Sequence, residues 1–567
     1  MSMPVDDIVY VSLLLLSIPF GHVVKVTKSA AGKQALTGVV GAAMAVLICR
    51  LHILHSLITT AVNCLIVKLL PQKYCHIISL IWCFTYLAFF RTTSWFGVPT
   101  PPAFANAVQL FLTLRMIGLA FEIHDTKYPL RKGEVDETLL KLYQNINPSV
   151  LDIFSYAYCY MGLLAGPYMK YRSYYDMLHE PDTQYINTVG PMLRRLANVP
   201  IIAAGYFTMS YFFSINYVKT DEFYDKPLWF RLFYMLPMFC VFRWRLYIAW
   251  ILAECSCMMA AYGAYPANSQ PKCGQGPSDL QALHQVKSQP KCNIEYNFEC
   301  VNNLYIWGCE LAPTTKEALR SWNKSVQYWL ANIVYRRVPF KSFRVSLTMG
   351  VSAYWHGVDP GYYMSFLTVP PILMAERAMI NAFRDEQPTI KQKIFDFLCW
   401  FFRMRGFDYN CMGFLLLSWK ETIRYWASIY FLGHRHTFLS LSPSFSLSVN
   451  FFPPLSLSPP PPSPSFPLSL FTTLFPLSLC HLLFPPLSPL SPTLSPLSPP
   501  LSPPLSPLSP LSLSPLPSLP LSHSLPPLFS LSLILSPLIL SPLLLSPHSL
   551  PLSPPSLSPS PPSPPSL

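Results

Sequence analysis

His356 has the residue type and the sequence setting of a general base. It lies at the end of an apolar run, in Ser352-Ala-Tyr-Trp-His-Gly-Val-Asp-Pro-Gly-Tyr-Tyr363. Gly357, Pro360 and Gly361 follow it, so we expect a helix to end or break here and to leave the ring accessible from one side. At its ordinary pKa of about 6.5, a neutral histidine can take a proton from a reacting group. A histidine that packs in a hydrogen-bonded core position is the competing interpretation.

A second candidate, Asn323, lies upstream on a segment with helical spacing. In Ser321-Trp-Asn-Lys-Ser-Val-Gln-Tyr-Trp-Leu330, polar residues recur about one turn apart and apolar residues form a stripe. This spacing predicts an amphipathic helix at an interface or a cavity, with plain packing as the alternative. An asparagine there can orient a reacting group or donate to a developing oxyanion. Asn323-Lys-Ser325 is also a formal glycosylation sequon, although an adjoining apolar helix is a poor place for modification.

Composition places these residues in a membrane protein. Of the 567 residues, 51% are hydrophobic and 12% are charged, whereas soluble proteins carry roughly a quarter charged residues. A membrane-spanning helix needs about 20 mostly apolar residues. Apolar segments, several of them short or interrupted, recur at 8–24, 35–49, 54–70, 75–90, 104–121, 151–168, 199–218, 232–242 with 246–259, 345–355, 362–379, 394–402 and 412–432. We expect an all-α, multi-pass integral membrane protein with about 11 transmembrane helices, and with re-entrant or short helices around an intramembrane chamber.

The end of the chain differs in composition from the first 435 residues. Residues 436–567 contain no Asp, Glu, Lys or Arg, and they hold 37 of the 61 prolines. From Phe451 on, nearly every residue is Leu, Ser, Pro or Phe, the four types that all-pyrimidine codons encode. Frequent proline blocks helices and sheet ladders, so we expect a disordered tail. We interpret it as translated non-coding sequence, with a proline-rich interaction arm as the alternative. The expected domains are therefore 1–435 and 436–567.

The 15 cysteines do not predict a metal site. No Cys-x-x-Cys pair with histidine partners occurs, so zinc is not expected. Four cysteines share the longest polar stretch of the first 435 residues: Cys273, Cys292, Cys300 and Cys309. They could form disulfides if this stretch is lumenal, or remain free thiols.

The two candidate segments together resemble the membrane-bound O-acyltransferase family. Trp322-Asn323 is followed about thirty residues later by Tyr354-Trp-His-Gly357, as in that family. Further similar stretches are Ser155-Tyr-Ala-Tyr-Cys-Tyr-Met-Gly-Leu-Leu-Ala-Gly-Pro-Tyr168, Phe242-Arg-Trp-Arg-Leu-Tyr-Ile-Ala-Trp250, Phe407-Asp-Tyr-Asn-Cys-Met-Gly-Phe414 and Arg424-Tyr-Trp-Ala-Ser-Ile-Tyr430. The resemblance covers residues 8–432. It ends where Gly433-His-Arg-His436 intervenes, so we expect the last helix to be truncated or replaced.

The resemblance implies that Asn323 and His356 are the active-site pair. His356 would take the proton of an acceptor hydroxyl as that hydroxyl attacks a thioester. Asn323 would position the thioester carbonyl or the acceptor. The donor would be acyl-CoA, a co-substrate, and no cofactor or metal is expected. Further substrate contacts are expected from Trp322, Tyr354, Trp355 and Ser352.

The run from Phe89-Phe90-Arg91 to Asn106-Ala-Val-Gln-Leu110 is most similar to family members that acylate lysophosphatidylinositol. The similarity implies transfer of a fatty acyl chain, expected to be arachidonoyl, to the sn-2 hydroxyl of that lysophospholipid. The reaction would belong to phospholipid remodelling in the endoplasmic reticulum membrane. The expected partners are membrane lipids and the two substrates, and no nucleic acid.

Three alternatives stay open. The first is a family member with another acceptor, which could be another lysophospholipid, a sterol, diacylglycerol or a protein. The second is a membrane transporter, because ionisable residues within apolar segments could line a pathway. The residues in question are His52, His55, Arg115, Glu122 and Glu254. The third is an inactive, truncated isoform.

Overall fold

The computed structural model describes residues 5–128, 143, 145–286, 294–384 and 389–441. Within these ranges the chain is mainly helical, and its strands are one antiparallel pair of two residues each, β1 (Tyr265–Pro266) and β2 (Tyr296–Asn297). The all-α prediction is confirmed. Residues 436–441, the start of the predicted disordered tail, are instead helical. From residue 442 on, the predicted tail lies outside the described residues, so the division at 435 stays a prediction.

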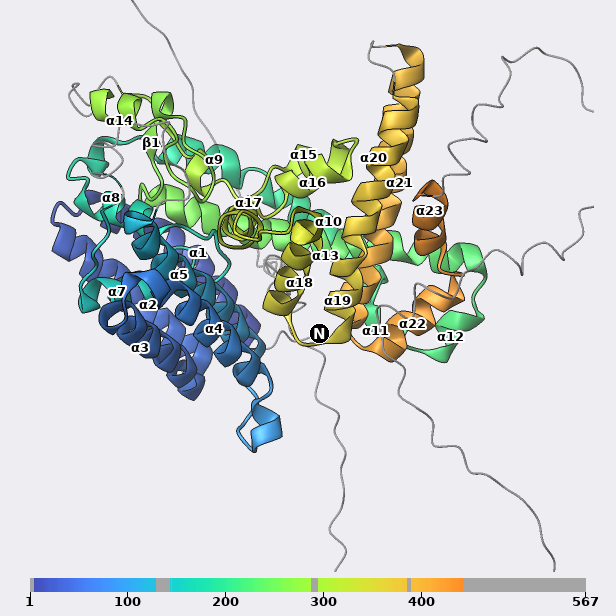
Figure 1. Cartoon of the computed structure of the whole chain (residues 1–567), viewed down its shortest axis with the longest axis horizontal. Helices are drawn as coiled ribbons and strands as arrows, with labels where there is room; N and C mark the ends of the chain where they lie inside the picture. Colours follow the sequence, from blue (N-terminus) through green and yellow to red (C-terminus); the bar gives the residue numbers. More distant parts are fainter. Residues whose placement is uncertain (1–4, 129–142, 144, 287–293, 385–388, 442–567) are drawn as a thin grey trace, which may run out of the picture. The chain divides into compact units, whose positions relative to one another are not determined.

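Five long helices open the chain, and α5 is the central one. They are α1 (Val5–Val26), α2 (Ala30–Cys49), α3 (Ile53–Leu69), α4 (Gln72–Arg91) and α5 (Ala103–Lys127). Every residue of α5 from Phe104 to Phe121 is buried, because α2, α3, α4 and α7 (Val150–Ala157) pack around it. A helix that is apolar on all sides can be covered in this way. Figure 1 shows α1 to α5 side by side in blue.

The segment 151–168, which we predicted as a span, is a short helix followed by a folded loop. α7 ends at Ala157, and the chain then turns through Gly162 and Gly166, both at positive φ. Arg115 of α5 explains the break, because its guanidinium donates to backbone carbonyl oxygens that a longer helix would use itself. These oxygens belong to Tyr156, Ala157, Cys159 and Met161. The span predicted at 151–168 is therefore wrong.

The middle of the chain leads to the longest helix. Its elements are α8 (Tyr171–His179), η3 (Thr183–Tyr185), α9 (Val189–Leu196), α10 (Val199–Phe212), α11 (Ile215–Val218), α12 (Asp221–Asp225) and α13 (Leu228–Met259). We expected one candidate span here, 232–242 with 246–259, interrupted by the charges of Arg243 to Arg245, and α13 is one continuous helix. Arg243 forms an ion pair with Glu310 at 2.8 Å, so its charge is balanced without a break in the helix.

Short helices precede the last long ones, which Figure 1 colours from green to orange. The first helices of this part are η4 (Ala267–Ser269), α14 (Leu280–Val286), η6 (Glu299–Val301), α15 (Ile306–Leu311), α16 (Thr315–Ser321), α17 (Lys324–Leu330), the π-helix η7 (Ala331–Tyr335) and η8 (Lys341–Phe343). The helices that follow are α18 (Arg344–His356), α19 (Pro360–Leu367), α20 (Val369–Phe383), α21 (Ile390–Leu416), α22 (Trp419–Ser428) and α23 (Leu432–Leu441). α19 packs against both α18 and α21. This contact connects two of the helices that contribute residues to the site described below.

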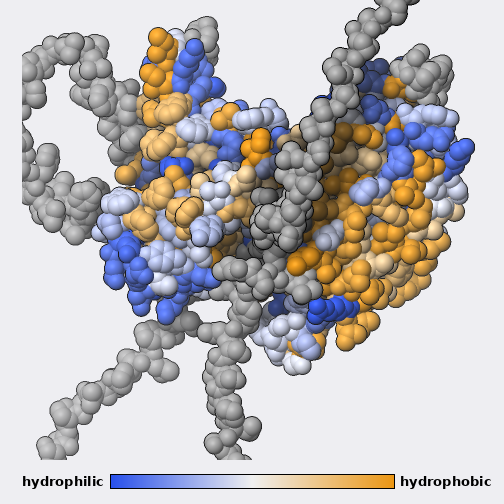
Figure 2. Space-filling model, turned by 180° about the vertical axis from the view of Figure 1, so that it is seen from behind, coloured by the Kyte–Doolittle hydropathy of each residue, from blue (hydrophilic) through white to orange (hydrophobic). Residues whose placement is uncertain are grey.

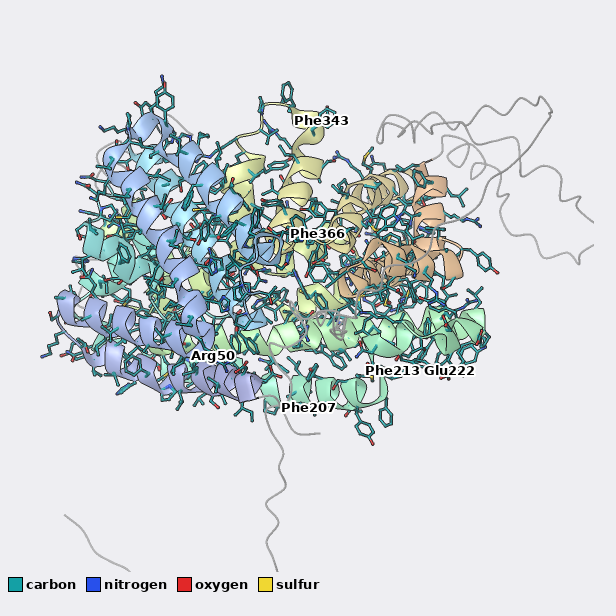
Figure 3. The ribbon with its side chains drawn as sticks, turned by 90° about the horizontal axis from the view of Figure 1, so that it is seen from below. Arg50, Phe207, Phe213, Glu222, Phe343 and Phe366 are labelled. Carbon is teal, nitrogen blue, oxygen red and sulfur yellow. The ribbon has the colours of Figure 1, made fainter. Side chains whose placement is uncertain are left out.

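Among the described residues, six helical stretches are long and apolar enough to cross a membrane. They are Asp6–Val26, Ala30–Leu69, Gln72–Arg91, Ala103–Lys127, Val189–Val218 and Leu228–Met259. The second covers two predicted segments, which η1 (Arg50–His52) separates; Arg50 is labelled in Figure 3. Several other predicted segments form helices shorter than a span, such as α18 with 13 residues and α19 with 8. Short helices are thus confirmed, and the number of about 11 spans stays a prediction.

The N-terminal helices carry a broad hydrophobic surface, orange in Figure 2. Large apolar side chains on α2 to α4 are well exposed, among them Val39, Leu54, Leu65 and Ile81. An exposed apolar surface of this extent is unfavourable in water and suits contact with lipid.

Candidate active site

A cavity of about 210 Å³ lies between α5, α13, α18, α19 and α21. Its wall is mainly apolar and aromatic, with Phe111, Phe239, Trp250, Phe407 and Phe414 among the lining residues. Phe366, which is labelled near the centre of Figure 3, contributes to the wall from α19. Asn323 and His356 are among the few polar side chains of the wall.

His356 is the last residue of α18, and its ring is held by aromatic neighbours. The ring centroid lies 5.1 Å from that of Phe366, 5.2 Å from that of Phe414 and 4.7 Å from that of Trp355. The Nδ1 atom is buried and has no hydrogen-bond partner among the described residues. The packing fixes the ring, while one ring nitrogen remains available to a bound molecule.

Gly357 ends the helix where the sequence predicts an end. Its backbone is extended, with φ −180°, and its N–H donates to the Ala353 carbonyl at 3.0 Å. A Cβ atom at this position would lie 2.1 Å from the ring of Tyr362. Glycine is therefore required by the close approach of Tyr362 rather than by its backbone conformation.

Arg91 of α4 binds the end of the helix that carries His356. Its guanidinium donates to the carbonyl oxygens of Tyr354 at 2.8 Å and Trp355 at 2.5 Å. A third hydrogen bond, from Nε to Oδ1 of Asn106 at 3.2 Å, fixes the arginine on α5. Helix C-terminal carbonyls attract a cation, so the contact is favourable. Burial raises the pKa of nearby Asp359, and the positive charge of Arg91 opposes that increase.

Asn323 lies in a sharp turn between α16 and α17. It adopts a left-handed conformation, with φ 45° and ψ 52°, which asparagine tolerates better than most residues. Gln327, one turn along α17, stabilises the turn by donating from Nε2 to the carbonyl oxygens of Leu319 and Trp322. The Oδ1 atom of Asn323 is buried and unpartnered among the described residues. The amphipathic helix predicted here is thus present, with Asn323 just before its first turn.

The structure brings two of the four predicted substrate contacts to the cavity. Trp322 and Trp355 line it; the Trp322 ring lies 5.0 Å from that of Trp250, and Nε1 of Trp355 donates to the Leu110 carbonyl at 3.2 Å. Tyr354 and Ser352 are not among the lining residues. The Tyr354 hydroxyl donates to the Phe84 carbonyl at 3.0 Å, so this side chain packs against α4 instead.

The surroundings of the sequon do not suit glycosylation. Ser325 is fully buried, and its hydroxyl donates to Oδ1 of Asn303 at 2.7 Å and accepts from the Tyr168 N–H at 3.0 Å. A transferase cannot reach a buried serine that is hydrogen-bonded on both sides.

Most of the ionisable residues considered for a transport pathway have structural partners. Arg115 supports the loop after α7, as described above. Glu122 accepts from the N–H groups of Tyr171 and Arg172, at 2.8 and 3.2 Å. Glu254 pairs with Arg195 at 2.5 Å and also accepts from two N–H groups before α15. These contacts account for the buried charges without a transported solute.

The polar stretch with four cysteines contains free thiols where it is described. Cys273, Cys300 and Cys309 are buried and unpaired, and Cys292 lies outside the described residues. In the described part of the chain, no three His, Cys, Asp or Glu side chains come together as a possible metal site.

Two residues at or beside the cavity, Arg91 and Asn410, were not predicted as site residues. Both lie in stretches that the sequence analysis used only for their resemblance to the family. The available signal was a polar residue within an otherwise apolar helix, which is unusual in a membrane protein. That signal does not reveal which neighbour the side chain meets.

Comparison of the whole chain with known proteins identifies a family that has these features. The model of the membrane-bound O-acyltransferase family matches residues 53–418, well over half of the chain. The chain therefore belongs to the membrane-bound O-acyltransferase family, as the resemblance predicted, and its class of enzyme is O-acyltransferase. It is a membrane-bound, multi-pass protein.

Similar proteins with more specific names cover most of the chain. The membrane-bound acylglycerophosphatidylinositol O-acyltransferase of Xenopus laevis is 43% identical over 436 residues, 76% of this chain and 91% of its own length. The protein of the same name from Homo sapiens is 40% identical over 444 residues, 77% of this chain and 92% of its own. That of Drosophila melanogaster is 32% identical over 454 residues, 76% and 90% of the two chains.

Proposed function

We propose that this chain transfers a fatty acyl group from acyl-CoA to lysophosphatidylinositol. The observation that carries the proposal is the wall of one apolar cavity, which presents a buried, unpartnered Nδ1 of His356 and Oδ1 of Asn323. Apolar surface suits an acyl chain, the unpaired ring nitrogen can accept from a hydroxyl, and the unpaired amide oxygen can accept from a further donor of the acceptor lipid. The names of the relatives, similar over three quarters of this chain, support an inositol lipid as the acceptor.

In the proposed reaction His356 acts as the general base. The acceptor hydroxyl loses its proton to the ring as its oxygen attacks the thioester carbonyl. The new carbon–oxygen bond forms, the carbon–sulfur bond breaks, and the protonated ring returns the proton to the sulfur of CoA. Asn323 positions the hydroxyl or the thioester carbonyl and can donate to the oxyanion in between. Both substrates are amphiphiles, which explains why the site lies in a membrane protein.

Three finer parts of the proposal rest on the family resemblance. The acyl chain is expected to be arachidonoyl, the acceptor position is expected to be the sn-2 hydroxyl, and the location is expected to be the endoplasmic reticulum membrane. The mainly apolar wall is compatible with a long acyl chain. It does not by itself select one chain over another.

The acceptor is tested in membranes from cells that lack this activity. The full chain is expressed, labelled arachidonoyl-CoA is supplied, and lysophosphatidylinositol, lysophosphatidylcholine or lysophosphatidylserine is offered. We expect labelled product mainly from the inositol lipid, with the label released by a lipase that cleaves the sn-2 ester. Equal use of all three acceptors, or label at another position, would overturn the corresponding part of the proposal.

A further inference from the structure

A third polar side chain of the cavity wall has no partner among the described residues. Asn410 of α21 is 7% exposed and lines the cavity, and both Oδ1 and Nδ2 of its amide are buried without a hydrogen bond. Its backbone carbonyl is satisfied, because Oγ of Ser365 donates to it at 2.8 Å. The unpaired groups are therefore confined to the side chain.

Neighbouring polar groups of the wall are paired. Arg243 donates to both carboxylate oxygens of Glu310, at 2.8 and 3.0 Å. The hydroxyl of Tyr247 donates to the same carboxylate at 3.0 Å. Buried polar atoms in proteins are rarely left without partners. The donor and the acceptor of the Asn410 amide are both unpaired, which points to a ligand that supplies an acceptor and a donor.

Asn410 lies about one helical turn from the reacting position. Phe414, four residues along α21, has its ring 5.2 Å from the ring of His356. Residues four apart lie on the same face of a helix, separated by roughly 6 Å along its axis. When an acceptor hydroxyl is at His356, Asn410 faces groups a few bonds away from it. In lysophosphatidylinositol, the polar groups in this range are the sn-1 ester, the phosphate and the nearest inositol hydroxyls, and of these only the hydroxyls can both donate and accept.

Two arginines contact phenylalanines that line the same cavity as Asn410. The guanidinium of Arg243 lies 4.6 Å from the ring centre of Phe239, and that of Arg403 lies 5.7 Å from the ring centre of Phe407. Arg403 also donates to the Glu310 carbonyl oxygen at 3.0 Å. Arg405 pairs with Asp408 at 2.8 Å, and Glu376 also interacts with Arg403, so positive and negative charges are matched here and selection of the acceptor falls to uncharged hydrogen-bonding groups.

We propose that Asn410 is a specificity-determining residue that binds the inositol head group of the acceptor. Nδ2 donates to one ring hydroxyl, and Oδ1 accepts from another. Each inositol hydroxyl can donate and accept, whereas the quaternary ammonium of choline can do neither. The inference rests on the proposed function, because it presumes that lysophosphatidylinositol is the acceptor.

The test is Asn410→Leu in the full chain, assayed in the same membranes. We expect the KM for lysophosphatidylinositol to rise about tenfold or more, as for the loss of two hydrogen bonds. The KM for acyl-CoA is expected to stay unchanged, and the preference for the inositol lipid over lysophosphatidylcholine is expected to fall by the same factor. Asn410→Gln retains both hydrogen-bonding groups and is expected to recover part of the preference.

Asn63→Leu is the matched control, because Asn63 is a buried asparagine outside the cavity. Its amide is paired with the Met116 carbonyl and the Ser79 hydroxyl. We expect this variant to accumulate less but to keep the wild-type preference. A KM for acyl-CoA that rises instead, or an Asn410→Leu variant with the wild-type preference, would overturn the inference. A wild-type chain without preference for the inositol lipid would overturn the proposed function itself.

Discussion

Asn323 and Asn63 show how residues of the same type differ between a site and a structural position. Both are asparagines of an apolar environment, but Asn63 has protein partners for its amide while Oδ1 of Asn323 has none. An unpaired buried polar atom costs about 1–3 kcal/mol. A substrate that supplies the partner recovers that free energy at the place where the reaction occurs.

Asn323→Gly tests this role while preserving the backbone. Glycine accepts the positive φ of this turn, so the fold should be retained. We expect kcat to fall by roughly 10²–10³-fold, because the variant lacks Nδ2, the atom that would donate to the oxyanion, as well as Oδ1. Accumulation in membranes should be normal. A kcat close to that of the wild type would show that the amide has no part in the transfer.

The sequence predicted Asn323 and His356, but it could not predict the directions of their neighbours. Successive helix residues are rotated by about 100°, so Tyr354, two positions before His356, projects to the other side of α18. There its hydroxyl reaches the carbonyl of Phe84. Trp355 remains on the cavity side. The helix phase depends on which face α4 covers, and that contact is made by residues more than 250 positions away in the chain.

At the scale of elements, α18 is held in place by α4. Arg91 joins them through the two carbonyl groups just before His356. Arg91→Met removes these hydrogen bonds, and a misplacement of about 1 Å can reduce a rate about 10²-fold. We expect a loss of kcat of that order, and a smaller loss in Arg91→Lys, which retains the charge but not the forked geometry.

Steady-state kinetics in membranes with equal protein content would measure both variants. If Arg91→Met and Arg91→Lys lost the same activity, the charge that lysine retains would have no part in holding α18, and only the forked hydrogen bonds of arginine would matter. If neither lost activity, α18 would be fixed by other contacts.

α19 and α21 contact each other at Gly361 and Gly413, where there is no room for a larger side chain. A Cβ atom on Gly361 would lie 2.3 Å from the carbonyl oxygen of Gly413, and the Gly361 N–H donates to the Leu417 carbonyl at 2.6 Å. Gly361→Ala should therefore destabilise the protein by about 1–3 kcal/mol through overpacking.

Gly406→Ala on α21 is the control, since a Cβ there has open space around it. Thermal unfolding of the detergent-solubilised chains should show a lower Tm for Gly361→Ala and an equal or higher Tm for Gly406→Ala. Equal Tm values for Gly361→Ala and the wild type would contradict the close packing of α19 on α21.

Elements with a long apolar run were predictable, and those shaped by a single buried charge were not. α1 to α5 follow the predicted segments within a few residues. The segment 151–168 does not, because Arg115 competes for its carbonyl groups. α13 continues through Arg243 because Glu310 balances it. Both outcomes depend on partners that are distant in sequence.

At the scale of the whole molecule, the cavity is assembled from residues between Ala107 and Phe414. The family match ends at residue 418, and the last described helix, α23, ends at Leu441. α23 packs against α20 and α21, and Nδ1 of its His434 lies 2.6 Å from the Tyr409 hydroxyl. The expected truncation or replacement of the last helix stays a prediction. The helical structure of residues 432–441 was not predicted from the sequence.

A chain that ends at Leu441 is expected to retain the transfer activity of the full chain, within about twofold, because it keeps every described residue that lines the cavity. Parallel expression and assay of the two chains would measure this. Loss of activity on truncation would assign a role to residues 442–567, and a gain would indicate that they hinder folding or access.

The most direct test of the central claim is His356→Ala in the full chain. We expect transfer from acyl-CoA to lysophosphatidylinositol to fall at least about 10²-fold, with normal accumulation in membranes. His22→Ala, at an exposed position of α1, should retain full activity. Transfer by His356→Ala at the wild-type rate would contradict the assignment of the base and, with it, the active site described for this protein.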